Sequence, residues 1–297
     1  MRLLLDTRDL IWLLDNSSPE RFSSFRQYLH DGQHTLVLTP STVREFASPL
    51  VKGGLGTEVS VISGLRALDQ LPKLFLRESA LVHEELKAAL AAYKAGKEPA
   101  PVGLFVDRLD RAFVGNENGR SRFYLNFGLP ECVLETFTGN LAVFGTLPSL
   151  LGDGIRAVYA ANRSLGPEAL RANLENFGDA VGNHLDRARL RLDPGEMPDF
   201  VTWLFENPTR CPGVRLGFEV SCQLACDVGD VPKDGDLVDF ALLRAVPYVD
   251  AVTLDKRIRH YCRGALARLE KEHMTLRFSR RIFSDVGDFM DKMPLAR

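Results

Sequence analysis

Long apolar runs, paired cysteines and a dominant charge sign are all missing from this chain of 297 residues. No stretch approaches the roughly 20 apolar residues that a membrane-spanning helix needs. The apolar start is interrupted by Asp6, Arg8 and Asp9, and no small-residue cleavage site follows it, which argues against a signal peptide. We therefore expect no membrane association and a cytoplasmic location.

Cysteine is scarce, and its spacing suggests no pairing. The five cysteines form an odd, scattered set, which predicts no disulfide framework and agrees with a reducing compartment. Cys222 and Cys226 are four residues apart, but no His or Cys pair nearby completes a tetrahedral set. We expect these two residues to be buried thiols, and no zinc site is predicted.

The net charge of only -2 does not indicate a binder of polyanions, yet the charges are unevenly distributed. Residues 256–297 hold eleven Lys and Arg against five Asp and Glu, a net charge of +6, so the rest of the chain carries -8. A basic C-terminal face beside an acidic site is therefore expected. Repeats and low-complexity tracts are missing too, and the composition is that of an ordinary globular protein.

Both ends of the chain alternate short apolar runs with amphipathic stretches. Residues 2–6 are predicted as a strand, followed by helices over 7–16 and 18–32. Residues 34–40 are predicted as a second strand, followed by a helix over 41–50. At the other end we predict a helix over 234–245, a strand over 247–255, a basic helix over 256–273, a strand over 274–279 and a helical tail. Trp12, Phe22 and Phe25 have spacings that predict core positions. Alternating strands and helices indicate a parallel sheet, hence an α/β fold.

The middle of the chain differs from both ends in its hydrophobic pattern. Helical periodicity dominates, and joints containing Gly and Pro separate the segments. We therefore predict a discontinuous α/β domain over 1–51 and 229–297, with a mostly helical insertion over 52–228. The insertion could cap the site, form a homo-oligomer surface or hold a protein partner.

Acidic residues follow the predicted strands, where ligands of open parallel sheets bind. Asp6 and Asp255 end two of these strands, while Glu45 and Asp239 lie on neighbouring helices that can reach the same crevice. Converging carboxylates repel one another, so such a cluster makes sense mainly as a cation site. Hard oxygen ligands fit Mg²⁺ or Mn²⁺, and such a metal activates water and offsets charge on a phosphodiester.

Three blocks of the chain resemble the PIN family of metal-dependent ribonucleases. The matching blocks are LLLDT at 3–7, STVREF at 41–46 and DLVDFALLRAVPYVDAVTLDKRI at 236–258, in the order the family has them. The resemblance implies a three-layer fold with a parallel sheet of four or five strands and an endoribonuclease activity on RNA. It assigns catalysis and metal binding to Asp6, Glu45, Asp239 and Asp255, with Thr253 completing the T-x-D motif.

Further residues are candidates around this set. Asp236 lies one helical turn before Asp239, and Asp250 lies within the predicted strand, where a solvent-facing role is the simpler interpretation. Glu45 could instead form a capping box with Thr42. A basic stretch directly after Asp255 is predicted either to be a solvated helix face or to contact RNA phosphates through Lys256, Arg257, Arg259 and Arg263.

One position departs from the family pattern and motivates a second hypothesis. Arg8 stands where the family often has Asn or Ser, and it could pair with the acids and compete with metal. The alternative function is thus a catalytically silent PIN-type scaffold that binds RNA or protein. A phosphatase that uses a strand-end Asp with a second Asp two residues later is disfavoured, because Arg8 occupies that second place.

Overall fold

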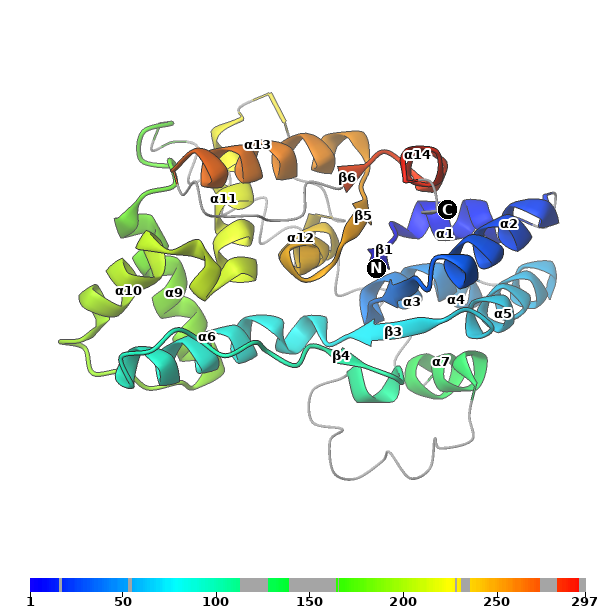
Figure 1. Cartoon of the computed structure of the whole chain (residues 1–297), viewed down its shortest axis with the longest axis horizontal. Helices are drawn as coiled ribbons and strands as arrows, with labels where there is room; N and C mark the ends of the chain where they lie inside the picture. The colour runs from blue at the N-terminus through cyan, green and yellow to red at the C-terminus, as the bar shows by residue number, and fades with distance from the viewer. Residues whose placement is uncertain are drawn as a thin grey trace.

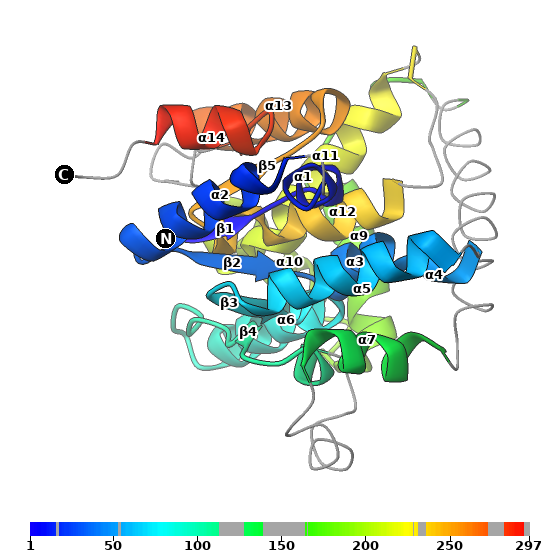
Figure 2. The same cartoon turned by 90° about the vertical axis from the view of Figure 1, so that its right-hand side faces the viewer.

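The computed structural model describes residues 1–15, 18–52, 55–112, 128–138, 164, 166–227, 229–230, 236–272 and 282–293. The fold is α/β, built on a six-stranded sheet in the order β4-β3-β2-β1-β5-β6. The strands are β1 (Arg2–Leu4), β2 (Thr35–Leu38), β3 (Lys73–Leu76), β4 (Phe105–Val106), β5 (Ala251–Thr253) and β6 (Ile282–Phe283). Every pairing is parallel except that of β3 with the edge strand β4. Figure 2 shows β5, β1, β2, β3 and β4 following one another down the molecule.

Helices surround this sheet (Figure 1). They are α1 (Thr7–Leu13), α2 (Pro19–Asp31), α3 (Pro40–Ala47), α4 (Pro49–Lys52), α5 (Leu55–Asp69), α6 (Glu78–Lys94), α7 (Leu129–Thr138), α9 (Leu174–Ala188), α10 (Met197–Glu206), α11 (Pro212–Cys226), α12 (Asp236–Ala245), α13 (Lys256–Glu272) and α14 (Val286–Lys292). Three short 3-10 turns are η1 (Asp110–Ala112), η2 (Pro208–Arg210) and η3 (Val246–Tyr248). Proline stands in the first turn of α2, α3, α10 and α11, where its missing N–H is not needed.

The central strands β1, β2 and β5 are buried on both faces, as parallel strands covered by helices must be. In β1 and the residue after it, Leu3 and Leu5 join one apolar cluster with α1, α2, α3 and α5, while Leu4 joins a second with α11, α12 and α13. Leu36 and Val37 of β2 divide between the two clusters in the same way. This period of two places consecutive side chains on opposite faces. Helices therefore cover both faces of the sheet.

A third apolar cluster lies among α6, α9, α10 and α11, at the left of Figure 1. A buried carboxylate joins this region to the sheet domain. Glu85 of α6 accepts hydrogen bonds from the backbone N–H of Gly213 at 2.7 Å, from that of Val214 at 2.8 Å and from the hydroxyl of Tyr248. The first N–H groups of a helix lack partners within the helix, so Glu85 satisfies the start of α11 from outside.

The expectation of four or five strands is wrong, because the sheet has six. The additional strands, β3 and β4, come from the range 52–228, where helical periodicity dominates the sequence. The strand expected over 247–255 begins only at Ala251, since Val246–Tyr248 form η3. The strand expected over 274–279 falls outside the described residues, and β6 instead lies within the expected helical tail.

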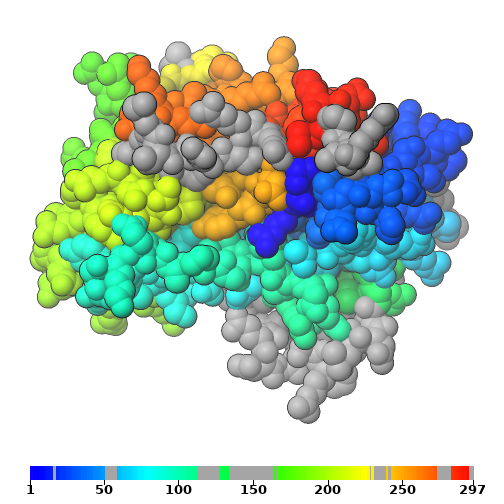
Figure 3. Space-filling model, viewed as in Figure 1, coloured from blue at the N-terminus to red at the C-terminus, as the bar shows by residue number. Residues whose placement is uncertain are grey.

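Residues from the two ends of the chain lie side by side in the sheet. β1 is central and pairs with β2 on one side and with β5 on the other. Figure 3 shows the N-terminal segment in blue against the C-terminal segments in orange and red. None of the described helices is both long and apolar enough to span a membrane.

Candidate active site

Acids stand at the carboxyl edge of the sheet in a regular pattern. Four of the five parallel strands, β1, β3, β5 and β6, are each followed two residues later by a carboxylate: Asp6, Glu78, Asp255 and Asp285, respectively. Because these strands are parallel, all four acids lie at the same edge. The second strand, β2, is followed instead by Thr39 and Pro40, which start α3.

Helix capping explains part of this pattern. One carboxylate oxygen of Asp6 accepts the N–H of Arg8 at 2.9 Å, one of Asp255 accepts that of Ile258 at 2.8 Å, and one of Asp285 accepts that of Asp288 at 2.8 Å. Such caps satisfy orphan donors in the first turn of a helix. Each cap uses one oxygen, so capping and binding at the crevice are compatible.

A buried threonine connects the first strand to the fifth. Thr253, at the end of β5, is fully buried, and its hydroxyl oxygen accepts the backbone N–H of Asp6 at 2.9 Å. The same hydroxyl is hydrogen-bonded to the carboxylate of Asp9. The T-x-D motif thus fixes Asp6 and Asp9 relative to β5.

Asp9 is a candidate site residue that no sequence pattern indicates. It lies in the first turn of α1 and is only 3% exposed. Burial raises the pKa of its carboxyl group, the Thr253 hydroxyl and Arg8 lower it, and the nearby charges of Asp6 and Asp285 raise it further. Its Oδ2 atom has no hydrogen-bond partner among the described residues. A buried, unpartnered carboxylate oxygen is costly unless a donor or a cation reaches it.

Arg8 lies over this buried acid. Its guanidinium donates to the carbonyl oxygen of Ser284 at 2.7 Å and comes within 3.6 Å of Asp9 Oδ1. The Arg8 side chain is 53% exposed, so water screens the ion pair. The sequence-based expectation that Arg8 approaches the acids is thus met, with Asp9 as the acid it approaches.

The other acids predicted for the site, Glu45, Asp239 and Asp236, do not follow strands and differ in their surroundings. Glu45 is exposed on α3, and its carboxylate accepts the hydroxyl of Thr7 at 2.5 Å, next to Asp6. Asp239 is half-buried on α12, a helix that packs mainly on α11 and α6. The side chain of Asp236 lies outside the described part of the chain.

Asp250 lies at the opposite edge of the sheet from Asp6. It immediately precedes β5, and its carboxylate accepts the backbone N–H of Arg2 at 2.7 Å, at the start of β1. Amino ends of parallel strands share one edge, and carboxyl ends share the other. The structure therefore separates Asp250 from the acids that follow the strands.

Within the described residues, no three or more His, Cys, Asp and Glu side chains gather closely enough to hold a metal ion. Two of the acids, Asp9 and Asp285, instead line a hollow at the strand ends, which we call the strand-end pocket. It measures about 420 Å³ and is lined by Arg8, Asp9, Trp12, Lys256, Arg259, Ser284, Asp285, Val286 and Gly287. Trp12, which helical spacing places in the core, is 42% exposed at its rim, so that expectation is wrong.

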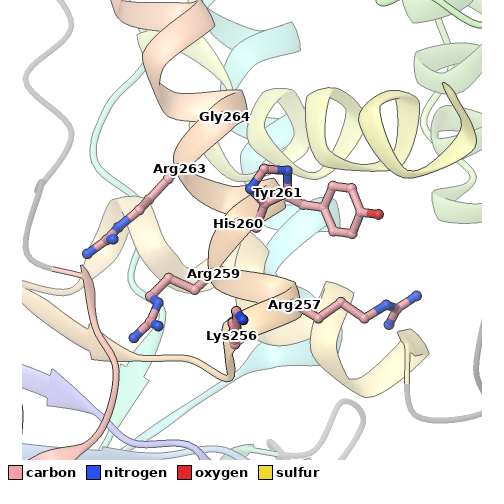
Figure 4. Close-up of a pocket in the computed structure, with 7 residues that line it drawn as sticks. All are labelled: Lys256, Arg257, Arg259, His260, Tyr261, Arg263 and Gly264. Carbon is pink, nitrogen blue, oxygen red and sulfur yellow. The ribbon is translucent and has the colours of Figure 1, made fainter. Parts of the chain in front are cut away.

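A larger basic hollow runs along α13 (Figure 4). It measures about 710 Å³ and is lined by Lys256, Arg257, Arg259, His260, Tyr261, Arg263 and Gly264. Two of the basic side chains already have partners: Arg257 pairs with Asp230 at 2.5 Å, and Arg263 donates to the carbonyl of Ile282 at 2.8 Å. Lys256 and Arg259 have no carboxylate within 4.0 Å in the described residues, and both also line the strand-end pocket. The basic hollow and the strand-end pocket are therefore adjacent.

The sequence pattern does not indicate Asp285 either, because it predicts a single helix over 280–293. The signal for it is the short apolar pair Ile282–Phe283 followed by Ser-Asp, which resembles a strand leading into a helix cap. Comparison with known proteins adds nothing to these assignments: no family model, no curated protein and no solved structure matches the chain.

Proposed function

We propose that the protein is a Mg²⁺- or Mn²⁺-dependent endoribonuclease of the PIN type, with its active site at the carboxyl edge of the sheet. The observation that carries the proposal is the unpartnered Oδ2 of Asp9, buried in a pocket that Asp285 also lines. A cation would satisfy that oxygen and offset the repulsion from Asp6 and Asp285, which raises the pKa of Asp9.

The donor chemistry fits a hard divalent ion. Asp6, Asp9, Asp255 and Asp285 offer carboxylate oxygens, the ligands that Mg²⁺ and Mn²⁺ prefer. No three acids converge within the described residues, so the proposal requires that the metal draw these side chains together. Glu45, whose carboxylate accepts the Thr7 hydroxyl next to Asp6, is a further proposed ligand. Asp239 remains a proposed member of the set on the family resemblance alone. When bound, the metal would lower the pKa of a water molecule and offset charge on the phosphodiester.

The protein's own residues divide into two roles. Lys256 and Arg259 lie between the acids and the basic hollow, where they can hold phosphate groups of an RNA strand beside the site. Thr253 positions Asp6 and Asp9 by its two hydrogen bonds.

Cleavage of a fluorescent single-stranded RNA in Mn²⁺ tests this function. Asp9→Asn and Asp285→Asn should each reduce the rate at least about ten-fold, the lower bound for losing a group that supports a metal. Asp250→Asn is the matched control, because Asp250 lies at the other edge and should leave the rate unchanged. Equal cleavage by all of these proteins would indicate a contaminating nuclease and remove the proposal.

A catalytically silent scaffold is the second candidate, and Arg8 is the observation that favours it. Its guanidinium already stands 3.6 Å from Asp9 and carries the charge that a metal would supply. Titration with Mn²⁺ by calorimetry separates the two functions. A silent scaffold would bind RNA but give no saturable Mn²⁺ site that disappears in Asp9→Asn.

A further inference from the structure

A second basic pocket lies away from the acidic site, between α6 and the end of α9. It measures about 600 Å³, and its charged and imidazole lining includes Arg77, Glu84, Lys87, His184, Arg187 and Arg189. Pockets of this size are typical of small-molecule sites. No residue of its lining also lines the strand-end pocket or the α13 hollow. In Figure 1, α6 and α9 lie at the lower left, whereas α1 and α14 lie at the upper right.

The charges in this pocket are not balanced by the described residues. Arg77 is 3.7 Å from Glu84, so that pair roughly cancels. Lys87, Arg187 and Arg189 have no carboxylate within 4.0 Å among the described residues, which leaves three cations facing one hollow. Like charges held together repel one another, and an anion in the pocket would relieve that repulsion.

A half-buried histidine lies in the same positive field. Desolvation by burial lowers the pKa of His184 to about 4, and the nearby charges of Arg244 and Arg187 lower it as well. His184 is therefore neutral near pH 7. Arg244, on α12, is half-buried near His184, and Glu85 is the opposing charge that acts on it.

One arginine that lines the pocket, Arg189, has a backbone conformation that residues other than glycine seldom adopt. Arg189 follows α9 in the left-handed conformation, with φ of 55° and ψ of 29°. Glycine is the usual residue at this position, because a Cβ atom disfavours it. Non-glycine residues in strained conformations cluster at binding sites. The strain here holds an arginine at the pocket, where glycine would suit the turn better.

We propose that this pocket binds a small ligand carrying at least two phosphate groups. Three unbalanced cations match the charge of two phosphate groups, each of which carries roughly -1.5 to -2. The described lining holds no Phe, Tyr or Trp, so recognition centres on the phosphates and not on a stacked base. The pocket volume exceeds that of pyrophosphate and leaves room for an organic part. Binding here does not require the nuclease activity.

Pyrophosphate is the probe that tests this site on the full chain, by calorimetry without divalent metal. An ionic strength of about 0.15 M screens exposed charges and suppresses diffuse attraction. Wild-type protein should bind one equivalent with saturable heat. Arg189→Gly keeps the left-handed turn and removes the guanidinium, so it should bind at least about ten-fold more weakly, as loss of a charge-assisted hydrogen bond requires. Its melting temperature should be unchanged or higher, which shows that the protein is folded.

A control variant locates the binding. Arg191→Gln removes an exposed arginine that does not line the pocket, and it should bind pyrophosphate like wild type. No saturable heat in wild type, or equal binding by Arg189→Gly, would overturn the proposal. A single-stranded RNA oligonucleotide is titrated in parallel. If Arg189→Gly weakens RNA binding but wild type does not bind pyrophosphate, the pocket is part of a nucleic-acid surface and the small-ligand proposal is wrong.

Discussion

The backbone N–H of Asp6 donates to the hydroxyl of Thr253, a residue 247 positions later in the chain. Since the same hydroxyl is bonded to Asp9, one threonine holds two acids of the proposed site in place. The relationship ties the end of β1 to the end of β5, at the centre of the sheet. Replacing the threonine of the T-x-D motif should therefore change both the stability and the proposed site.

Thr253→Val should destabilise the fold and weaken the site together. Valine has nearly the same shape, but it leaves the Asp6 N–H and the Asp9 carboxylate without a partner in a buried place, at a cost of about 1–3 kcal/mol. Urea unfolding measures the loss. Thr253→Ser keeps the hydroxyl and should recover most of it; if both variants lose the same free energy, packing and not hydrogen bonding explains the role of Thr253.

Asp9→Asn should raise the stability at neutral pH. The raised pKa of Asp9 means that the folded state binds its proton more readily than the unfolded state does. Stability should therefore fall as pH rises from the ordinary pKa of an unfolded aspartate through the higher pKa of Asp9 in the folded protein. The advantage of Asp9→Asn should be largest above that window and shrink as pH falls through it, in melting curves at a series of pH values. A variant less stable than wild type at pH 7 would contradict an uncompensated buried carboxylate.

Arg8→Gln should strengthen Mn²⁺ binding by removing the competing cation. The Arg8 side chain is 53% exposed, so the gain should be at most about five-fold, the factor that corresponds to an exposed ion pair. Calorimetry with Mn²⁺ measures the change. Arg21→Gln, which removes an arginine stacked on Trp12 from α2, serves as the control for losing one positive charge nearby. An equal gain in both variants would mean that Arg8 has no specific role.

Gly213→Ala should disrupt the start of α11. A Cβ atom there would lie 2.6 Å from the carbonyl oxygen of Arg244 and 3.0 Å from a carboxylate oxygen of Glu85. Overpacking of this kind costs about 1–3 kcal/mol. By contrast, a Cβ at Gly182 of α9 meets nothing within 4 Å, so Gly182→Ala should stabilise the protein by about 0.5–1 kcal/mol. Opposite signs in the two urea transitions are expected; a neutral Gly213→Ala would mean that α11 can shift away from Glu85.

Local patterns in the sequence predict the part of the fold that depends on local chemistry. The runs ending at Asp6 and Asp255 predict β1 and β5, and Pro40 after an apolar run predicts the end of β2 and the start of α3. Strands β4 and β6 have only two residues each, too short for any period to be visible. Strand β3 is flanked by strongly helical segments, so its apolar residues look like one more helix turn.

The site was predictable only where an acid ends a strand. Asp6 and Asp255 follow from that rule. Asp285 does not, only because the last strand is expected over 274–279 and β6 lies at Ile282–Phe283. Asp9 could not be identified, because an aspartate in the first turn of a helix normally faces water. Its burial is decided by Thr253, which comes from the far end of the chain. The same long-range packing, not visible in the sequence, separates Asp250 from the other acids.

The central position of β1 has a consequence for how the protein is made. During synthesis β1 is made before the other strands of the sheet, and one of its two neighbours, β5, follows only after 246 further residues have been added. Until then the edge of β1 that pairs with β5 is open, and an open strand edge invites pairing with other chains. Contacts between distant segments also slow folding. The sheet is therefore expected to close around β1 only after residues 251–253 have been synthesised.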